Sequence, residues 1–249
     1  MLSEAPQQDL YGDNPRPELV PLLPVRATRI LDVGCGAGGF ARTLRSHYGP
    51  DAQIAGVEPV PSQAQRALRN GFDTVFQGYF PNAVDPSETF DLITFNDVLE
   101  HVIDPWETLT TAKGYLNSGG AIVAAIPNLQ YAPVALGLVA GRWLYVDTGI
   151  LDRTHLRFFT RETVVDMFRG AGLRIERIEM VNSVWVNDWG LPRPNPIRER
   201  IRKKSLTAIR RLWLRRHPDA EFMHLAVRAT ASEAQDEQIL GQKAPVGRH

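Results

Sequence analysis

The stretch ILDVGCGAGGF, residues 30–40, decides the fold class, because it joins a short apolar run to a glycine-rich turn. Gly34, Gly36 and Gly39 follow the G-x-G-x-x-G spacing of a dinucleotide-binding turn. Glycine lets the backbone approach a ligand closely, and the helix that follows presents unpaired amides and the positive end of its dipole. The stretch therefore predicts a strand, a ligand-binding turn and a helix, in that order.

Apolar runs alternate with helical segments through the first half of the chain. Each predicted strand is a short apolar run, and the clearest helix start is Asp104-Pro105, a capping residue followed by a proline that suits the first helical position. Strands are expected at 29–34, 53–58, 72–78, 90–96 and 121–127, and helices near 39–48, 62–70 and 105–116. This alternation predicts an α/β fold with a doubly wound parallel sheet, whose ligands lie at the carboxyl ends of the strands.

The chain is expected to form one domain over residues 26–230, between a proline-rich leader at 1–25 and a flexible tail at 231–249. The segment 131–159, called the acceptor loop below, is longer than a simple connection, which predicts a lid-like insertion over a binding pocket. A satellite core or a dimer patch is the alternative. The remaining regular elements are predicted as a helix at 160–173 and strands at 174–180 and 222–229.

The composition indicates an ordinary globular protein with a sizeable core. The 249 residues are 43% hydrophobic and 22% charged, and the formal net charge of zero gives no reason to expect nucleic-acid binding. Cys35 is the single cysteine, which excludes an internal disulfide and is typical of a reducing cytoplasm. The most apolar window, residues 131–146, is interrupted by Pro133 and Gly141 and is too short to span a bilayer. We therefore expect a cytoplasmic protein.

Residues 193–217, called the basic segment below, hold ten Arg or Lys residues and Glu199 as their one acid. Apolar residues recur there at near-helical spacing, which predicts an amphipathic basic helix between the last two strands. Most such runs form a solvated face. The alternative is peripheral contact with an anionic membrane or with a phosphate-bearing acceptor. Nucleic-acid binding has less support, because no aromatic-interleaved groove motif accompanies the charges.

Asp32 argues against a dinucleotide in the glycine turn. It stands two positions before Gly34, and a pyrophosphate favours backbone amides but is repelled by a nearby carboxylate. A cofactor that carries an ammonium group would instead gain from a carboxylate at this place. Glu58 ends the second predicted strand and can accept both hydroxyls of a ribose, which both classes of cofactor possess.

Three motifs follow one another between about residues 28 and 128, namely LDVGCGAGG at 31–39, GVEPV at 56–60 and FDLITFNDVLEHV at 90–102. In this combination and order they resemble the class I S-adenosylmethionine-dependent methyltransferases. A fourth piece, LDRTHLRFFT at 151–160, resembles a branch of that family with many bacterial small-molecule and glycan-modifying methyltransferases. The resemblance implies a Rossmann-like seven-stranded sheet whose last strand is antiparallel, with S-adenosyl-L-methionine as the cofactor.

The resemblance also implies where this cofactor would bind. Asp32 and the glycine turn would hold its amino-acid end, Glu58 its ribose, and residues 96–98 would line the methionine and sulfonium region. The family often has an acidic residue after the third strand that contacts the adenine, but this chain reads FQGYFPN there, which leaves that contact to Gly78 or Tyr79. The cofactor-binding residues expected in this way are Asp32, Gly34, Cys35, Gly36, Glu58, Gly78, Tyr79, Asn96, Asp97 and Val98.

Transfer of a methyl group from a sulfonium needs proximity, in-line alignment and a deprotonated acceptor. A hydroxyl acceptor benefits from a general base, for which histidine is the usual choice. His155 and His101 are therefore the candidate catalytic residues, and no metal site is expected. His155 can alternatively anchor its loop through Asp152 or a backbone carbonyl, and His101 can pack against the cofactor. The other histidines of the central chain, interpreted as structural or surface residues away from the motifs, are His47, His217 and His224.

Together these features predict a methyltransferase that acts on a hydroxyl of a small molecule or glycan, which would be lipid-linked if the basic segment contacts a membrane. Nitrogen and carbon acceptors stay open, and so does a homodimer. One rival hypothesis is a non-catalytic, methyltransferase-like accessory protein that binds the cofactor without turnover. The other is an NAD-dependent oxidoreductase with its dinucleotide in the turn at residues 34–39.

Overall fold

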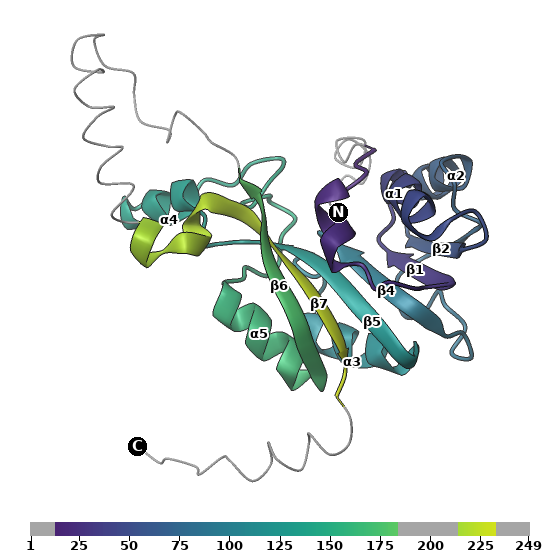
Figure 1. The fold of residues 1–249 in the computed structure, drawn as a ribbon. Helices are drawn as coiled ribbons and strands as arrows, with labels where there is room; N and C mark the ends of the chain where they lie inside the picture. Colours follow the sequence, from purple (N-terminus) through teal and green to yellow (C-terminus); the bar gives the residue numbers. More distant parts are fainter. Residues whose placement is uncertain (1–12, 184–213, 233–249) are drawn as a thin grey trace.

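The computed structural model describes residues 13–183 and 214–232, which form one seven-stranded sheet (Figure 1). The strand order is β3-β2-β1-β4-β5-β7-β6, and β7 runs antiparallel to both of its neighbours while the other pairs are parallel. The strands are β1 (Arg29–Val33), β2 (Gln53–Glu58), β3 (Thr74–Gln77), β4 (Phe90–Asn96), β5 (Leu116–Pro127), β6 (Leu173–Ser183) and β7 (Phe222–Ala231). The predicted α/β sheet with an antiparallel last strand is confirmed.

Helices cover both faces of the sheet (Figure 1). One face carries α1, α2 and the 3-10 helix η2, whose buried side chains share one apolar cluster, and the other face carries α3 and α5 with a second cluster. The short elements α4 and η3 lie where β5 ends and β7 begins. The bounds are η2 (Pro17–Leu22), α1 (Gly39–Tyr48), α2 (Pro61–Arg69), α3 (Pro105–Gly114), α4 (Ala132–Val139), α5 (Arg161–Gly170) and η3 (Pro218–Glu221).

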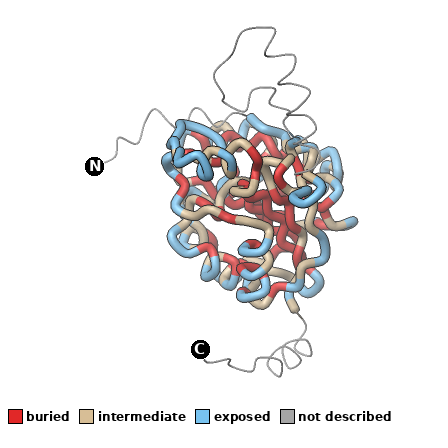
Figure 2. The backbone as a smooth tube through the Cα atoms, turned by 90° about the vertical axis from the view of Figure 1, so that its left-hand side faces the viewer, coloured by how far each residue is buried: buried red, intermediate tan, exposed pale blue. Residues whose placement is uncertain are grey.

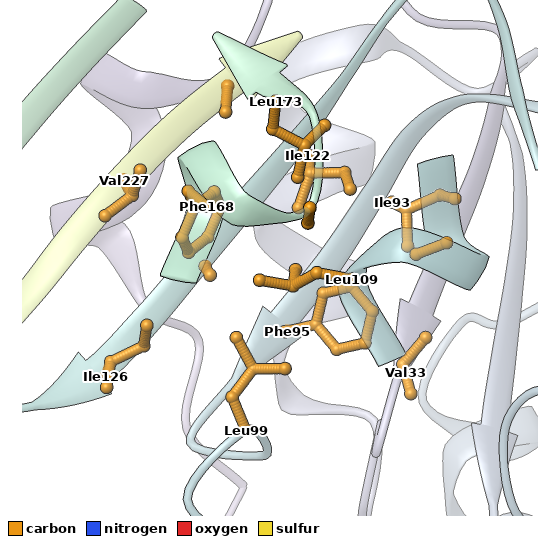
Figure 3. Packing of buried hydrophobic residues seen from close by; sticks show 14 of the residues in the cluster. Val33, Ile93, Phe95, Leu99, Leu109, Ile122, Ile126, Phe168, Leu173 and Val227 are labelled. Atoms are coloured by element: carbon orange, nitrogen blue, oxygen red, sulfur yellow. The ribbon is translucent and has the colours of Figure 1, made fainter. Parts of the chain in front are cut away.

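The core lies between the sheet and its helices, where branched aliphatic and aromatic side chains interdigitate (Figure 3). Phe95 of β4 and Phe168 of α5 are both fully buried, and Leu109 of α3 meets them from the same face. Complete burial of a side chain of this size contributes about 1.5–3 kcal/mol. The buried residues accordingly run through the middle of the molecule and the exposed ones along its outer loops (Figure 2).

The boundary between α3 and β5 differs from the prediction. The Asp104 carboxylate accepts a hydrogen bond from the Glu107 amide at 2.9 Å and starts α3 as expected, but the helix ends at Gly114. Strand β5 then begins at Leu116, five positions earlier than predicted, because the Phe90 amide donates to the Tyr115 carbonyl at 2.8 Å and extends the ladder past a bulge.

Residues 13–25, the described part of the predicted leader, contribute to the core. Leu19 and Leu22 of η2 have no exposed surface and pack in the cluster beneath α1. Arg177 of β6 donates to the Pro21 carbonyl at 2.9 Å, which ties this segment to the far edge of the sheet. Most of the basic segment (193–213) and nearly all of the predicted tail (233–249) lie outside the described residues.

The acceptor loop leaves β5 and returns to α5 beside its starting point. The Leu129 amide donates to the Phe159 carbonyl at 2.8 Å, and residues 128 and 159 form an isolated bridge. Between these ends lie α4 and a turn whose large apolar side chains are exposed, among them Leu138, Val139, Leu144 and Tyr145. Within the ranges 13–183 and 214–232, no helix combines the length and the apolarity that crossing a membrane requires.

Candidate active site

The glycine turn between β1 and α1 depends on the absence of side chains. Gly34 and Gly36 have φ angles of +71° and +51°, in the left-handed region that favours glycine. A Cβ on Gly34 would lie 2.6 Å from the Val98 Cγ2 atom, so Val98 closes over this residue. The amides of Gly34 and Cys35 both donate to the Val57 carbonyl, at 2.8 and 3.1 Å. The turn is therefore held against β2, and Gly34 and Gly36 place no side chain between its backbone and a ligand.

Asp32 lies beneath this turn as a buried carboxyl group. Its Oδ1 atom accepts hydrogen bonds from the Thr94 hydroxyl at 2.6 Å and from the Asn96 amide at 3.1 Å. Burial raises the pKa of Asp32 to about 7, although both hydrogen bonds oppose the shift. Neighbouring Asn96 has a buried Oδ1 atom with no partner among the described residues. The Asp32 carboxyl group and the Asn96 amide oxygen can thus both accept hydrogen bonds from a ligand, such as those that the ammonium group of an amino acid would donate.

Glu58 ends β2 on the other side of the turn. Its Oε2 atom accepts from the Gly36 amide and its Oε1 atom from the Val60 amide, each at 2.9 Å. Each carboxylate oxygen keeps a further lone pair, so the group can still accept ribose hydroxyls. Burial raises the pKa of Glu58 above its usual value.

Cys35, Gly78 and Tyr79 are three further residues expected to contact the cofactor. Cys35 is buried, and burial raises the pKa of its thiol, so it stays protonated and fills space beside Gly56. The Gly78 amide donates to the Glu58 carbonyl at 3.1 Å, which places the end of β3 beside the predicted ribose site. Tyr79 is 74% exposed. The adenine contact of Gly78 or Tyr79 stays a prediction.

Asp97 follows β4 and contacts residues from both ends of the chain, Arg16 and His224. It has a φ of +54°, and its Oδ2 atom accepts a hydrogen bond from the Arg16 guanidinium. Its Oδ1 atom lies 3.3 Å from the His224 Nε2 atom. The Asn182 amide nitrogen lies 3.2 Å from the His224 Nδ1 atom, and since an amide NH₂ donates, Nδ1 accepts and the neutral ring carries its proton on Nε2.

His224 and Arg16 lie at the candidate site, and the sequence did not disclose this. The interpretation of His224 as lying away from the motifs is wrong, because β7 pairs antiparallel with β5 and sets His224 opposite Pro127, at the carboxyl end of the sheet. Arg16 precedes the first strand, and its guanidinium is largely buried among the carboxylates of the site. An arginine between two prolines carries no local signal for such a position.

Glu100 and His101 face His155 across the boundary between β4 and the acceptor loop. The Glu100 carbonyl accepts from the amides of Leu156 and Arg157, at 2.8 and 3.0 Å, which fastens the two segments together. The rings of His101 and His155 meet edge to face with their centroids 4.6 Å apart. The structure therefore brings together both predicted catalytic histidines. It adds Glu100, a residue of the motif at 90–102 for which the sequence suggested no role.

The Glu100 side chain is the least compensated group of this cluster. It is 1% exposed, and neither carboxyl oxygen has a hydrogen-bond partner among the described residues. Burial raises the pKa of Glu100 to about 8. The His155 Nδ1 atom donates to the Ile150 carbonyl at 3.0 Å, so the predicted anchoring by a backbone carbonyl is present, while His155 Nε2 lies 3.9 Å from Glu100 Oε1.

Both histidines are neutral near pH 7. Burial lowers the pKa of His101 to about 4 and also lowers the pKa of His155. Glu100, His101 and His155 each offer one possible ligand atom within 4.8 Å of the others, so these three residues are also a group that could hold a metal ion.

The comparison with protein families agrees with the glycine turn and its carboxylates. Residues 8–178 match the family model described as a methyltransferase domain. The chain belongs to this family. As a class I S-adenosylmethionine-dependent methyltransferase, it has a cofactor with an ammonium group and a ribose, which suits the buried carboxyl of Asp32, the orphaned oxygen of Asn96 and the carboxylate of Glu58. The dinucleotide-dependent oxidoreductase is thereby excluded.

The methyltransferase is also similar to individual proteins. It is 29% identical to the ubiquinone biosynthesis O-methyltransferase of Cereibacter sphaeroides over 175 residues, which are 68% of this chain and 70% of that protein. The enzyme of the same name from Xanthomonas euvesicatoria is 28% identical over 196 residues, 74% of this chain and 80% of that protein.

Solved structures show the same fold. An S-adenosylmethionine-dependent methyltransferase from Mesorhizobium loti aligns with a TM-score of 0.52 at 22% identity, over 86% of this chain and 95% of that one. Another, from Archaeoglobus fulgidus, aligns with a TM-score of 0.55 at 17% identity, over 85% of this chain and 89% of that one.

Proposed function

We propose that this methyltransferase transfers the methyl group of S-adenosylmethionine to a hydroxyl group of a small molecule or glycan. The observation that carries the proposal is the cluster of Glu100, His101 and His155, which joins the end of β4 to the acceptor loop. Two similar proteins bear the name O-methyltransferase, which supports oxygen as the acceptor atom.

The reaction forms a bond between the acceptor oxygen and the methyl carbon while the bond between that carbon and the sulfonium breaks. The acceptor must lose its hydroxyl proton, because an alkoxide or phenolate attacks far better than a neutral hydroxyl. The carboxyl group of Asp32 and the oxygen of Asn96 would orient the amino-acid end of the cofactor, and Glu58 would orient its ribose. In this arrangement the chain's own residues fix the donor, and the histidine cluster meets the acceptor.

The test is methyl transfer from labelled S-adenosylmethionine to a panel of phenols, catechols and hydroxylated glycans. We expect transfer to oxygen, measured by mass spectrometry of the product, and loss of transfer in the His155→Ala variant with cofactor binding retained in calorimetry. Binding of S-adenosylmethionine without transfer to any of these acceptors would instead support the accessory protein, and transfer to nitrogen or carbon would contradict the proposed acceptor atom.

We further propose that the acceptor loop and the basic segment contact an anionic membrane surface, which would bring a lipid-linked acceptor to the site. The loop presents exposed apolar side chains, including Val139 and Leu144. The basic segment ends beside the start of this loop, since Asn128 donates to the carbonyl of Asp219 in η3 at 2.9 Å. Basic and apolar groups together favour binding to anionic lipid.

Co-sedimentation with liposomes tests this contact. We expect binding to vesicles that contain phosphatidylglycerol and weaker binding after Arg210→Glu combined with Arg211→Glu. If the double variant sediments with these vesicles as fully as the parent protein does, the proposed membrane contact is wrong. A homodimer that covers the same apolar residues is the other outcome, and light scattering without lipid detects it.

A further inference from the structure

We propose that Glu100, His101 and His155 bind a divalent metal ion, which in turn binds the acceptor hydroxyl. The catalytic consequence rests on the proposed O-methylation, whereas binding of the ion does not. The three residues come from two segments that converge at one point, the end of β4 and the acceptor loop. Their ligand atoms lie within 4.8 Å of one another. An ion with bonds of about 2.1 Å would draw such atoms to about 3.4 Å, which is a small adjustment.

The carboxylate of Glu100 gives the first argument for an ion. It is 1% exposed, and both of its oxygens lack hydrogen-bond partners within the described ranges. Burial of a polar group without hydrogen-bond partners is unfavourable. Arg16 is the nearby cation, but its guanidinium already contacts Asp97 and lies 3.8 Å from Glu18. A metal ion would supply a positive charge that favours the ionised form of Glu100, and it would bind a carboxylate oxygen that now has no partner among the described residues.

His155 gives the second argument. Its Nδ1 atom must donate to the Ile150 carbonyl, because a carbonyl cannot donate, so the neutral ring directs the lone pair of Nε2 toward Glu100 Oε1 at 3.9 Å. Two lone pairs that face each other need a proton or a cation between them. The structure thus points either to a shared proton or to an ion at this place.

The surroundings of His101 and His155 fix both rings from behind, as is usual for metal ligands. The Thr154 hydroxyl donates to Asp152 Oδ1 at 2.7 Å, so at 3.2 Å it accepts a hydrogen bond from the His101 Nδ1 atom. The chain of Asp152, Thr154 and His101 resembles the carboxylate–histidine arrangement behind many metal sites. His155 has the Ile150 carbonyl in the same role.

The donor set indicates the class of ion and its use. Two imidazoles and one carboxylate suit Zn²⁺, Co²⁺, Mn²⁺ or Fe²⁺ and leave at least one coordination position open. A hydroxyl bound at that position loses its proton to solvent more readily, and the metal-bound oxygen anion then attacks the methyl carbon. This assignment replaces the histidine base expected from the sequence.

Titration of the full-length, untagged and chelator-treated protein with Co²⁺, followed by visible absorption and calorimetry, tests the site. We expect one ion per chain, displaced by Zn²⁺, and binding at least about 100-fold weaker in Glu100→Gln, His101→Ala and His155→Ala. The matched controls are His47→Ala and Glu162→Gln, both exposed and far from the cluster in sequence, which should bind Co²⁺ as the parent protein does. Unchanged binding of S-adenosylhomocysteine shows that each variant is folded.

The outcomes separate this proposal from the proposed function. Absence of Co²⁺ binding, or binding that the three variants leave unchanged, would overturn the metal site and favour a proton shared by Glu100 and His155. Methyl transfer to oxygen with an unchanged kcat/KM in excess chelator would overturn its catalytic role while the proposed O-methylation stands. Co²⁺ binding at this cluster without transfer to any hydroxyl would refute the O-methylation alone.

Discussion

The two halves of the proposed active site, one for the cofactor and one for the acceptor, are built in different ways. The cofactor half uses the ends of β1, β2 and β4, which adjoin one another in the sheet, and its contacts are short, such as Asp32 to Thr94 at 2.6 Å. The acceptor half joins β4 to a loop more than 50 positions later in the chain. Its His155 Nε2 and Glu100 Oε1 atoms are 3.9 Å apart. Both halves keep buried oxygens without partners among the described residues, Asn96 Oδ1 in the cofactor half and both Glu100 carboxyl oxygens in the acceptor half. The difference is that the cofactor half is braced by short hydrogen bonds, whereas the Glu100 carboxyl group has none within the described ranges.

The largest effect is expected in the acceptor half. His155→Ala or Glu100→Gln should lower kcat/KM for a hydroxyl acceptor by about 10²–10⁴-fold, because activation of the acceptor is lost. The dissociation constant of S-adenosylhomocysteine, measured by calorimetry, should stay within about twofold of the parent value, since neither residue belongs to the predicted cofactor contacts. A comparable loss of cofactor binding would show that the two halves are not separable.

In the cofactor half, Asp32→Asn should weaken binding of S-adenosylmethionine by about 10–100-fold, because a charge-assisted hydrogen bond to the ammonium group is lost. Calorimetry measures this change. Asp85→Asn is the matched control, since Asp85 is exposed and its side chain bonds only locally, to Ser87. An equal effect of both substitutions would argue against an ammonium site at Asp32.

The pH dependence of cofactor binding is a second test of an ammonium site at Asp32. The pKa of Asp32 is raised to about 7 in the ligand-free protein, so the carboxyl group is protonated at lower pH and must ionise to pair with an ammonium group. Affinity should therefore rise with pH and level off above about 7, and at pH 6 it should be about tenfold below that plateau. Asp32→Asn should remove this dependence, and a parent protein whose affinity is flat between pH 5 and 8 would contradict the assignment.

Glycine at position 34 offers a test of the turn itself. Gly34→Ala should destabilise the protein by about 1–3 kcal/mol in urea unfolding, because the φ of +71° strains an L-residue and the new Cβ would meet Val98 Cγ2 at 2.6 Å. Gly36→Ala is the comparison, since its Cβ would meet no described atom within 4 Å and its cost should be nearer about 1 kcal/mol. Val98→Ala should recover part of the first loss and none of the second.

The smallest effect is expected at His224, which supports Asp97 from β7. His224→Asn removes the contact of 3.3 Å to Asp97 Oδ1, and we expect cofactor binding to weaken by about 2–10-fold. His47→Ala, an exposed change on α1, should have no effect. A loss as large as that of Asp32→Asn would mean that His224 contacts the cofactor directly.

The sequence could indicate the residues proposed for the cofactor half because their signals are local. Asp32, the glycine turn and Glu58 lie at strand ends that apolar runs mark clearly, and a parallel sheet places such ends side by side. The same rule brought Asn96 and Asp97 to this edge. The sequence does not mark element boundaries that backbone hydrogen bonds decide, as at Leu116, which pairs with Phe90 and so belongs to β5.

The rest of the site depends on contacts between distant parts of the chain. His224 reaches Asp97 only because β7 runs antiparallel, a reversal that sets residue 224 at the carboxyl end of β5. Arg16 reaches the same carboxylate from a segment predicted as a leader, and no spacing or periodicity marks it. Glu100 stood within a recognised motif, but its burial without partners becomes visible only in three dimensions.

The most direct test of the account is a crystal structure of the protein with S-adenosylhomocysteine bound. We predict the amino group of the ligand at Asp32, its ribose hydroxyls at Glu58, and its sulfur directed toward the space in front of Glu100, His101 and His155. A ligand whose sulfur points away from His155, or whose ribose lies outside the reach of Glu58, would contradict the account. The cofactor half and the acceptor half would then not form one methyl-transfer site.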